Sequence, residues 1–415
     1  MSTVSLPDLG RRARSAARLL ATMPSSAKDA ALVLAAEGLT TSADEILSAN
    51  ATDVARSVES GASPTVVDRL RLSEERVAAM ADGLRAVAAL PDPVGEVVEG
   101  HVRPNGLRVE RVRVPLGVVG IIYENRPNVT ADAAALCLKS GNAALLRGSA
   151  GALESNRVIA SSFSQAIAKA GLPPDAVLLV EDTAHATAVE FVRLRGVIDC
   201  LIPRGGPALI SMILEHATVP YVLDGDGNCH VYVDAAADLS MAERIVVNAK
   251  MQRPSVCNAA ETLLVHKGVA DEFLPRMGLA LDGVVLAADE RARPLLPGSR
   301  PASEADFATE FLALELAVGV VDDLDGAIAH IARYGSGHSE DIVTSDLEAA
   351  TRFVREVDAA AVLVNASTRF IDGGELGLGA EVGISTQKLH ARGPMGLREL
   401  TCVKYVVYGQ GQIRP

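Results

Sequence analysis

The stretch Gly117-Val-Val-Gly-Ile-Ile-Tyr123, followed by Glu124-Asn-Arg-Pro-Asn128, decides the fold class. Its first part is a continuous apolar run that ends in turn residues, which is typical of a strand buried on both faces of a parallel sheet. A helical pattern then predicts a helix over 129–140 and a strand over 143–147. The same alternation continues with helices over 151–170 and 184–192, strands over 177–180 and 197–202, and a helix to about 216.

A second run of alternating strands and helices begins near residue 231. Alternation of this kind predicts a parallel sheet with helices on both faces, so we expect an α/β protein with two doubly wound domains. In such a sheet the ligand crevice lies beyond the carboxyl ends of the strands. The second run predicts strands over 261–266, 284–286, 316–321, 341–344 and 360–364, and helices over 269–281, 324–334 and 346–356.

Two segments far apart in the sequence alternate apolar and polar residues like exposed strands. Residues 99–116 contain Asn105-Gly106, the strongest short-range hairpin signal, and residues 401–408 carry the second alternating pattern. We expect the two segments to pair into a small β-ribbon arm. The resulting division is a first domain over 1–100 and 117–228, a second domain over 229–366, and the arm over 101–116 and 385–415.

Composition excludes several classes of protein. Lys plus Arg number 39 against 52 Asp plus Glu, and this balance of −13 argues against nucleic acid or an anionic membrane as a partner. The five Cys are scattered without a C-x-x-C pair, which fits a reducing compartment, so we expect a cytoplasmic protein. No stretch reaches the roughly 18 continuous apolar residues of a membrane span, and the eight dispersed His predict no metal site.

Cys257 is the candidate nucleophile. A helical pattern that follows Asp238 is ended by Pro254, whose ring cannot continue a helix. Cys257 comes next on a short polar turn, and residues 262–265 have the pattern of a buried strand. The thiol is therefore held on a tight loop between two rigid elements. An isolated Cys is more often a small buried residue than a nucleophile. The choice between these two roles therefore depends on the rest of the chain.

Polar residues also stand where strands of the first domain end. Asn125 follows one strand, Arg147 ends the next, and Gly205 and Gly206 follow a third. Glycines between a strand and a helix let backbone N–H groups approach an anion. The alternative for Asn125 is a turn residue whose side chain hydrogen-bonds to its own backbone. The alternative for Gly205 and Gly206 is an ordinary Gly-rich turn that binds no ligand.

The chain resembles the γ-glutamyl phosphate reductases, also called glutamate-5-semialdehyde dehydrogenases, which form a branch of the aldehyde dehydrogenase superfamily. The order of Asn125, Arg147, the Gly-rich turn, Cys257 and Glu310 resembles the superfamily as a whole. Five blocks resemble the branch, and together they cover nearly the whole chain. They are Tyr-Glu-Asn-Arg-Pro-Asn-Val-Thr (123–130), Lys-Ser-Gly-Asn (139–142), Gln-Arg-Pro-Ser-Val-Cys-Asn (252–258), Val-Asn-Ala-Ser-Thr-Arg-Phe (364–370) and Ser-Thr-Gln-Lys-Leu-His-Ala-Arg-Gly-Pro-Met-Gly-Leu (385–397).

This resemblance implies an NADPH-dependent oxidoreductase of proline biosynthesis, which reduces L-glutamyl 5-phosphate to L-glutamate 5-semialdehyde and phosphate. Cys257 would form a thioester, and Asn125 would join the backbone N–H of Cys257 in stabilising the oxyanion. Hydrolytic members of the superfamily carry a Glu-Leu-Gly-Gly block whose Glu activates water, whereas Tyr221–His230 contains no Glu. Two alternatives stay open: a hydrolytic NAD(P)-dependent aldehyde dehydrogenase, and a catalytically silent binding protein of the same fold.

The resemblance also assigns binding residues and partners. Arg147 stands where the family has a Lys that faces the adenine ribose, and a guanidinium suits a 2′-phosphate, so NADP is expected as the cofactor. Gly205, Gly206 and Glu310 would also bind it. A homo-oligomer (dimer or tetramer) held by the β-ribbon arm and a transient contact with glutamate 5-kinase are implied. The expected substrate-binding residues are Arg126, Arg253, Asn365, Ser367, Thr368 and Arg369.

Overall fold

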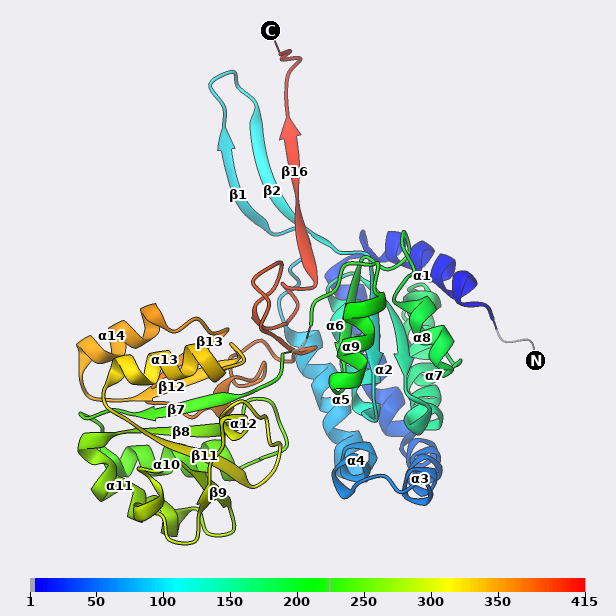
Figure 1. Cartoon of the computed structure of the whole chain (residues 1–415). Coiled ribbons are helices and arrows are strands. Elements are labelled where there is room, and N and C mark those ends of the chain that lie inside the picture. The colour runs from blue at the N-terminus through cyan, green and yellow to red at the C-terminus, as the bar shows by residue number, and fades with distance from the viewer. Residues whose placement is uncertain (1–3, 224, 415) are drawn as a thin grey trace. The chain divides into compact units, whose positions relative to one another are not determined.

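The computed structural model describes residues 4–223 and 225–414, and the chain forms two compact units. Unit 1 contains Met1–Leu223, Gly377–Gly383 and Met395–Pro415, and unit 2 contains Asp224–Leu376 and Ile384–Pro394. Each unit has its own parallel sheet flanked by helices (Figure 1), which confirms the predicted α/β class. The β-ribbon groups with unit 1, whereas residues 224–228 and 384–394 group with unit 2.

β3 (Val118–Tyr123) lies inside the sheet of unit 1, which has the order β5-β4-β3-β6. Its neighbours β4 (Ala143–Gly148) and β6 (Cys200–Arg204) both run parallel to it, and β5 (Val177–Leu179) pairs in parallel with β4. Every residue of β3 and β4 is buried, as their continuous apolar runs predict.

Helices lie on both sides of this sheet (Figure 1). α6 (Pro127–Lys139) and α7 (Leu153–Lys169) contact the strands, and α2, α3 and α5 pack outside them, which explains the helical pattern of the first hundred residues. The other helices of unit 1 are α1 (Leu6–Leu20), α2 (Ser25–Thr41), α3 (Ala43–Glu59), α4 (Pro64–Leu70), α5 (Glu74–Ala89), α8 (His185–Phe191) and α9 (Pro207–His216).

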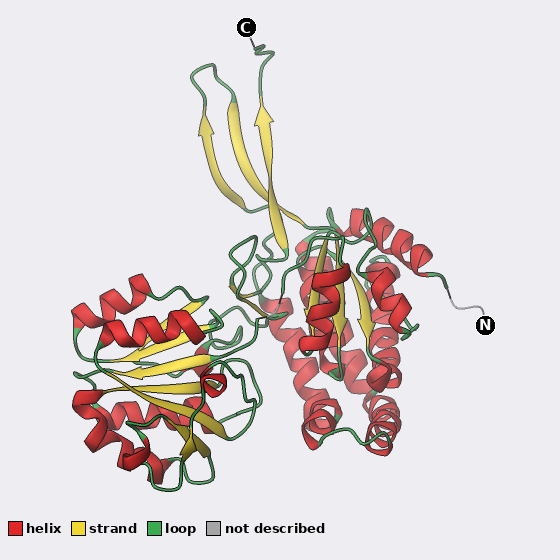
Figure 2. Cartoon of the chain, viewed as in Figure 1, coloured by secondary structure: helices red, strands yellow, loops and turns green. Residues whose placement is uncertain are grey.

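A three-stranded antiparallel ribbon projects from the body of unit 1 (Figure 2). β2 (Arg108–Pro115) pairs on one side with β1 (Val97–Val102) and on the other with β16 (Thr401–Tyr408). Gly106 in the turn between β1 and β2 has φ +85, the left-handed conformation that an Asn-Gly turn requires. The predicted pairing of the two distant segments is therefore confirmed within one chain.

The sheet of unit 2 has seven parallel strands in the order β10-β9-β11-β8-β7-β12-β13. Successive residues of β8 (Ala260–His266) face opposite sides: Leu263 and Val265 pack with α10 and α11, and Leu264 packs with α13 and α14. Both faces are thus buried beneath helices (Figure 1). The remaining elements are β7 (Cys229–Val233), α10 (Leu239–Met251), α11 (Lys267–Ala280), β9 (Val285–Ala288), β10 (Arg300–Pro301), α12 (Glu304–Phe307), β11 (Glu315–Val321), α13 (Leu324–Tyr334), β12 (Ser339–Val343), α14 (Leu347–Glu356), β13 (Ala361–Val364), β14 (Ile384–Ser385) and β15 (Gly393–Pro394).

The candidate site residues occupy different ends of the two sheets. In unit 1, Asn125, Arg147 and Gly205 lie at the carboxyl ends of β3, β4 and β6. In unit 2, Cys257 precedes β8 and Glu310 precedes β11, so these side chains lie at the amino ends of the strands. Among the described residues, no helix combines the length and the apolar character needed to cross a bilayer.

Candidate active site

Asn125 occupies a strained turn between β3 and α6. Its φ of +47 lies in the left-handed region, which is uncommon for a residue with a side chain, although Asn tolerates it best. Ser149, after β4, fixes this turn: its Oγ accepts from the Asn125 backbone N–H at 3.2 Å and donates to Asn125 Oδ1 at 3.0 Å. Since the carbonyl oxygen of the side chain serves the turn, the Nδ2 amide is the group that can donate to an oxyanion.

Arg147 is a buried cation at the end of β4. Its side chain is 6% exposed, and Nη2 donates to the backbone oxygen of Ala184 at 2.8 Å. Burial lowers the pKa of Arg147, and nearby Asp182 partly offsets this effect. Among the described residues Nε is buried without a hydrogen-bond partner. A guanidinium that retains an unused donor suits an anionic ligand.

The Gly205–Gly206 turn presents a cradle at the amino end of α9. A Cβ at Gly205 would lie 2.6 Å from Glu124 Oε2 and from Leu209, so a larger residue would require these two side chains to move. The backbone N–H of Gly206 donates to Glu124 Oε2 at 3.0 Å, and the Glu124 carboxylate thus occupies the helix terminus that the sequence assigned to the cofactor. Arg126 lies half-buried at the N-cap position of α6, one residue after Asn125.

The Cys257 loop of unit 2 is held through its backbone. The buried thiol of Cys229, at the start of β7, donates to the carbonyl oxygen of Cys257 at 3.1 Å. Gly227 packs so closely that a Cβ there would lie 1.6 Å from the same oxygen. Cys257 itself is half-buried and packs against the apolar cluster of Leu363, Ile371 and Ile384.

Glu310 supports the loop from the other side of Gly227. Its Oε1 accepts the backbone N–H of Gly227 at 2.8 Å. The turn after Glu310 is held in place by Glu261 of β8, which accepts from the N–H of Leu312 at 3.2 Å. Glu261 also pairs with Lys250 of α10 at 2.5 Å, and both side chains are fully buried. Burial raises the pKa of Glu261 to about 7 and lowers that of Lys250, while each partner opposes the shift of the other.

Arg369 and Thr368 clamp Asn258, the residue after the cysteine. Thr368 Oγ1 donates to the Asn258 backbone oxygen at 2.7 Å, and Arg369 donates to Asn258 Oδ1. Burial lowers the pKa of Arg369, and the neighbouring charge of Arg253 adds to this, whereas Asp372 and Cys257 oppose it. Arg369 therefore combines a hydrogen bond to the residue after Cys257 with a positive charge that interacts with Cys257.

Two of the predicted substrate-binding residues also form hydrogen bonds within unit 2. Asn365 bridges the loops after β12 and β13, where Oδ1 accepts from the Thr344 N–H at 2.9 Å and Nδ2 donates to the Thr344 carbonyl at 2.9 Å. Ser367 Oγ accepts from the N–H of Arg369 at 3.3 Å and caps a short helical turn. Of the predicted set in unit 2, the structure therefore brings Thr368 and Arg369 to the cysteine loop.

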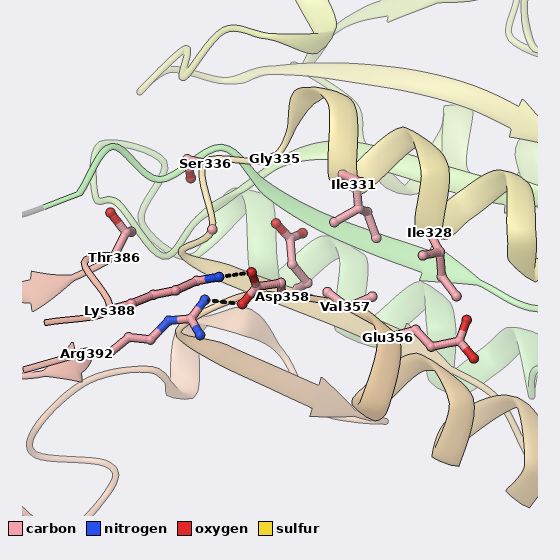
Figure 3. A pocket seen from close by; sticks show the side chains of 13 residues that line it. Ile328, Ile331, Gly335, Ser336, Glu356, Val357, Asp358, Thr386, Lys388 and Arg392 are labelled. Carbon is pink, nitrogen blue, oxygen red and sulfur yellow. Dashed lines mark hydrogen bonds and ion pairs between the residues drawn. The ribbon is translucent and has the colours of Figure 1, made fainter.

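A cavity of about 380 Å³ opens beside α13 and the loop that follows it, and its wall includes none of the predicted site residues. Figure 3 shows Lys388 and Arg392 reaching Asp358 from the segment between β14 and β15. These three charged groups satisfy one another, with Arg392 Nη2 at 2.8 Å from Asp358.

Several supporting residues escaped the sequence analysis. Gly227, Cys229, Lys250 and Glu261 act on the cysteine loop through backbone contacts or buried charge. Lys250 and Glu261 stand inside apolar helix and strand patterns, and a charged residue at such a position indicates a buried ion pair. Among the described residues, no group of three or more His, Cys, Asp or Glu could hold a metal ion.

The class of protein follows from comparison with known families. The sequence profile described as the aldehyde dehydrogenase family matches residues 7–291, and the chain belongs to this family. An acetylating aldehyde dehydrogenase from Geobacillus thermoglucosidasius, 16% identical, shares the fold with a TM-score of 0.72 over 99% of this chain and 97% of that one.

Within this family the chain is similar to γ-glutamyl phosphate reductases. It is 56% identical to the enzyme of Thermobifida fusca over 98% of both chains, and 56% identical to that of Carboxydothermus hydrogenoformans over 98% of this chain and 99% of that one. The crystal structure of γ-glutamyl phosphate reductase from Thermotoga maritima matches with a TM-score of 0.96 and 47% identity, over 99% of this chain and all of that one.

We predict that Gly227→Ala displaces the Cys257 loop, because the new Cβ would overlap the Cys257 carbonyl oxygen. Turnover should fall about 10²-fold, the effect expected when a reacting group moves by about 1 Å. The rate of Cys257 alkylation by iodoacetamide should change as well. Gly326→Ala is the control, since its Cβ would meet Val321 at 3.5 Å, an ordinary contact. Unchanged turnover in Gly227→Ala would show that this contact does not set the position of the cysteine.

Proposed function

We propose that the chain reduces L-glutamyl 5-phosphate to L-glutamate 5-semialdehyde with release of phosphate, through a thioester on Cys257. The observation that carries the proposal is the Cys257 loop: a half-buried thiol on a rigid turn, with the cation of Arg369 nearby. The γ-glutamyl phosphate reductases to which the chain is 56% identical supply the substrate.

The proposed reaction has two steps, formation of a thioester and its reduction. The Cys257 thiolate attacks the acyl carbon, the carbonyl oxygen becomes an oxyanion, and collapse of this intermediate expels phosphate and leaves a thioester. Asn125 Nδ2 and the backbone N–H of Cys257 are the proposed donors to the oxyanion. The bound nicotinamide cofactor supplies the hydride for the second step. The resulting thiohemiacetal then expels the Cys257 thiolate and releases the aldehyde.

Enzymes of the aldehyde dehydrogenase family use NAD or NADP, and we propose NADP for this chain. Arg147 fits the 2′-phosphate because its buried guanidinium has a donor, Nε, without a partner among the described residues. Gly205 and Gly206 fit the close approach of an anion, provided that Glu124 releases the Gly206 N–H. Glu310 is the proposed contact to the nicotinamide ribose.

The region where hydrolytic relatives carry their Glu supports reduction rather than hydrolysis. In this chain the corresponding stretch contains Gly227, Asn228 and Cys229, and all three are buried. Asn228 is committed to structure, since Nδ2 donates to the carbonyl oxygens of Phe307 and Tyr334, each at 2.7 Å. The stretch Tyr221–His230 contains no Glu but two carboxylates, Asp226 and Asp224, of which Asp224 lies outside the described residues. We assign neither of them to the activation of water, so the proposed thioester survives until hydride arrives.

The anionic groups of the substrate are proposed to bind the cations of the predicted set, Arg126, Arg253 and Arg369. Arg369 and Arg253 belong to unit 2, and Arg126 belongs to unit 1. Thr368 positions the loop, while Ser367 and Asn365 shape the segment that carries Arg369. We propose a cytoplasmic location, because the substrate is a charged small molecule and the thiols must stay reduced. We also propose glutamate 5-kinase as the transient partner that supplies the acyl phosphate.

The direct test supplies glutamate, ATP and a glutamate 5-kinase together with NADPH. We expect NADPH oxidation that requires all components and disappears in Cys257→Ala, while NADPH binding by fluorescence titration is retained. Cys402→Ser is the control, because Cys402 is an exposed residue of the β-ribbon. If Cys257→Ala kept more than a trace of turnover, another residue would have to be the nucleophile.

Arg147 should determine the preference for NADPH over NADH. We expect Arg147→Gln to raise the KM for NADPH by about 10- to 100-fold, because a charge-assisted contact is lost, and to leave the KM for NADH nearly unchanged. Arg157→Gln is the control, since Arg157 pairs on the surface of α7 with Glu154 and Glu181. Equal changes for both cofactors would show that Arg147 does not bind the 2′-phosphate.

The β-ribbon is the proposed contact between subunits of a dimer or tetramer. It exposes Tyr405 (68%), Val407 (54%) and Val102 (68%) although exposed strand edges and apolar side chains favour association. We expect Val407→Lys to shift the protein toward smaller species in size-exclusion chromatography with light scattering. Leu279→Lys, at an 83% exposed position of α11, should not. A fully active wild-type monomer at micromolar concentration would contradict this proposal.

A further inference from the structure

Helix α6 leaves one accessible stripe at the carboxyl end of the sheet of unit 1. Of its residues, only Asn128 and Asp132 are not buried. They stand four positions apart and therefore share one face of the helix. This helix begins two residues after Asn125, the proposed oxyanion donor. A polar stripe on an otherwise buried helix, next to a proposed catalytic group, is a candidate binding surface.

Asp132 is a poorly solvated carboxylate on this stripe. Asn128 Nδ2 donates to Asp132 Oδ2 at 3.0 Å. Burial raises the pKa of Asp132 to about 6, while the Asn128 hydrogen bond and the charge of Arg204 oppose that effect. A carboxylate has about four acceptor positions, and a neutral amide fills one of them. A half-buried anion of this kind gains strongly from a cationic ligand.

Space beside Asp132 is kept open by Gly83, in the interior of α5. A Cβ built on Gly83 would meet Asp132 Oδ1 at 3.9 Å and no other atom within 4 Å, apart from its own helix. Gly is a poor residue for a helix interior, and its φ does not call for it here. The missing side chain thus leaves room in front of Oδ1.

We propose that Asp132 binds the α-ammonium group of the amino-acid substrate and so selects an α-amino acyl chain over the same chain without the amine. The inference rests on the proposed function and deepens it. Asp132 lies roughly 8 Å along α6 from the first residue of that helix. A glutamyl chain can span this separation when protein side chains extend toward the substrate from both ends. Asn128 then orients the carboxylate, and Asp132 contributes the opposite charge.

The test compares two aldehydes in the reverse reaction, with NADP⁺ and phosphate: glutamate 5-semialdehyde and glutarate semialdehyde, which lacks the amine. In the wild type, kcat/KM should favour the amino aldehyde. Asp132→Asn should lower this preference by about 10- to 100-fold, the value of a charge-assisted contact, and leave kcat/KM for glutarate semialdehyde nearly unchanged. Cyclisation of the amino aldehyde affects both proteins equally and cancels in the comparison.

Asp82→Asn is the matched control, because Asp82 precedes Gly83 on α5 but pairs on the surface with Arg85 at 2.7 Å. The preference of Asp82→Asn for the amino aldehyde should equal that of the wild type. If Asp132 were only structural, Asp132→Asn would lower both rates and the melting temperature together, and the inference would fail. The inference also fails if the variant keeps the full preference. A wild type that oxidises neither aldehyde with phosphate would instead refute the proposed function itself.

Discussion

The position of the Cys257 carbonyl group is the constraint on which unit 2 depends. One side of this carbonyl receives the Cys229 thiol at 3.1 Å, and the other meets the bare backbone of Gly227. Gly227 is in turn held by Glu310, and the turn that carries Glu310 is held by the buried Lys250–Glu261 pair. Burying an ion pair costs free energy, so we interpret this pair as a structural support. It connects helix α10 and strand β8 to the turn that carries Glu310, and through Gly227 to the cysteine loop.

Electrostatics and geometry act together at this loop. Arg369 donates a hydrogen bond to Asn258, and its charge interacts with Cys257, so one residue both holds the loop and contributes a cation to it. Unit 1, taken by itself, contains candidate groups of a different kind: a strained Asn125, a buried Arg147 and a half-buried Asp132. Asn125 and Arg147 lie at the carboxyl ends of parallel strands, where such a sheet accommodates ligands, and Asp132 lies in the helix that follows β3.

The sequence predicted the architecture well because both sheets follow simple periodic patterns. Short continuous apolar runs bounded by turn residues, such as Val118–Tyr123, indicate strands buried on both faces, and Asn105-Gly106 predicted the hairpin. The site was predicted less completely. Cys257 and Arg147 stand at element boundaries, where motifs are informative, whereas Gly227 and Cys229 act through backbone atoms that no motif reveals. Asn365, taken for a substrate contact, bridges two loops through Thr344, because its amide matches a backbone N–H and C=O at once. No sequence motif identifies Asp132, whose surroundings depend on the packing of α5 against α6.

The dependence of the reverse reaction on phosphate tests the central claim most directly. If Cys257 forms a thioester as proposed and neither Asp of the stretch Tyr221–His230 activates water, phosphate is the group that resolves the thioester in the reverse direction. With glutamate 5-semialdehyde and NADP⁺, NADPH formation should therefore be absent without phosphate and rise in proportion to phosphate at low concentrations. Steady NADPH formation in phosphate-free buffer would show that water resolves the thioester, and would contradict the account.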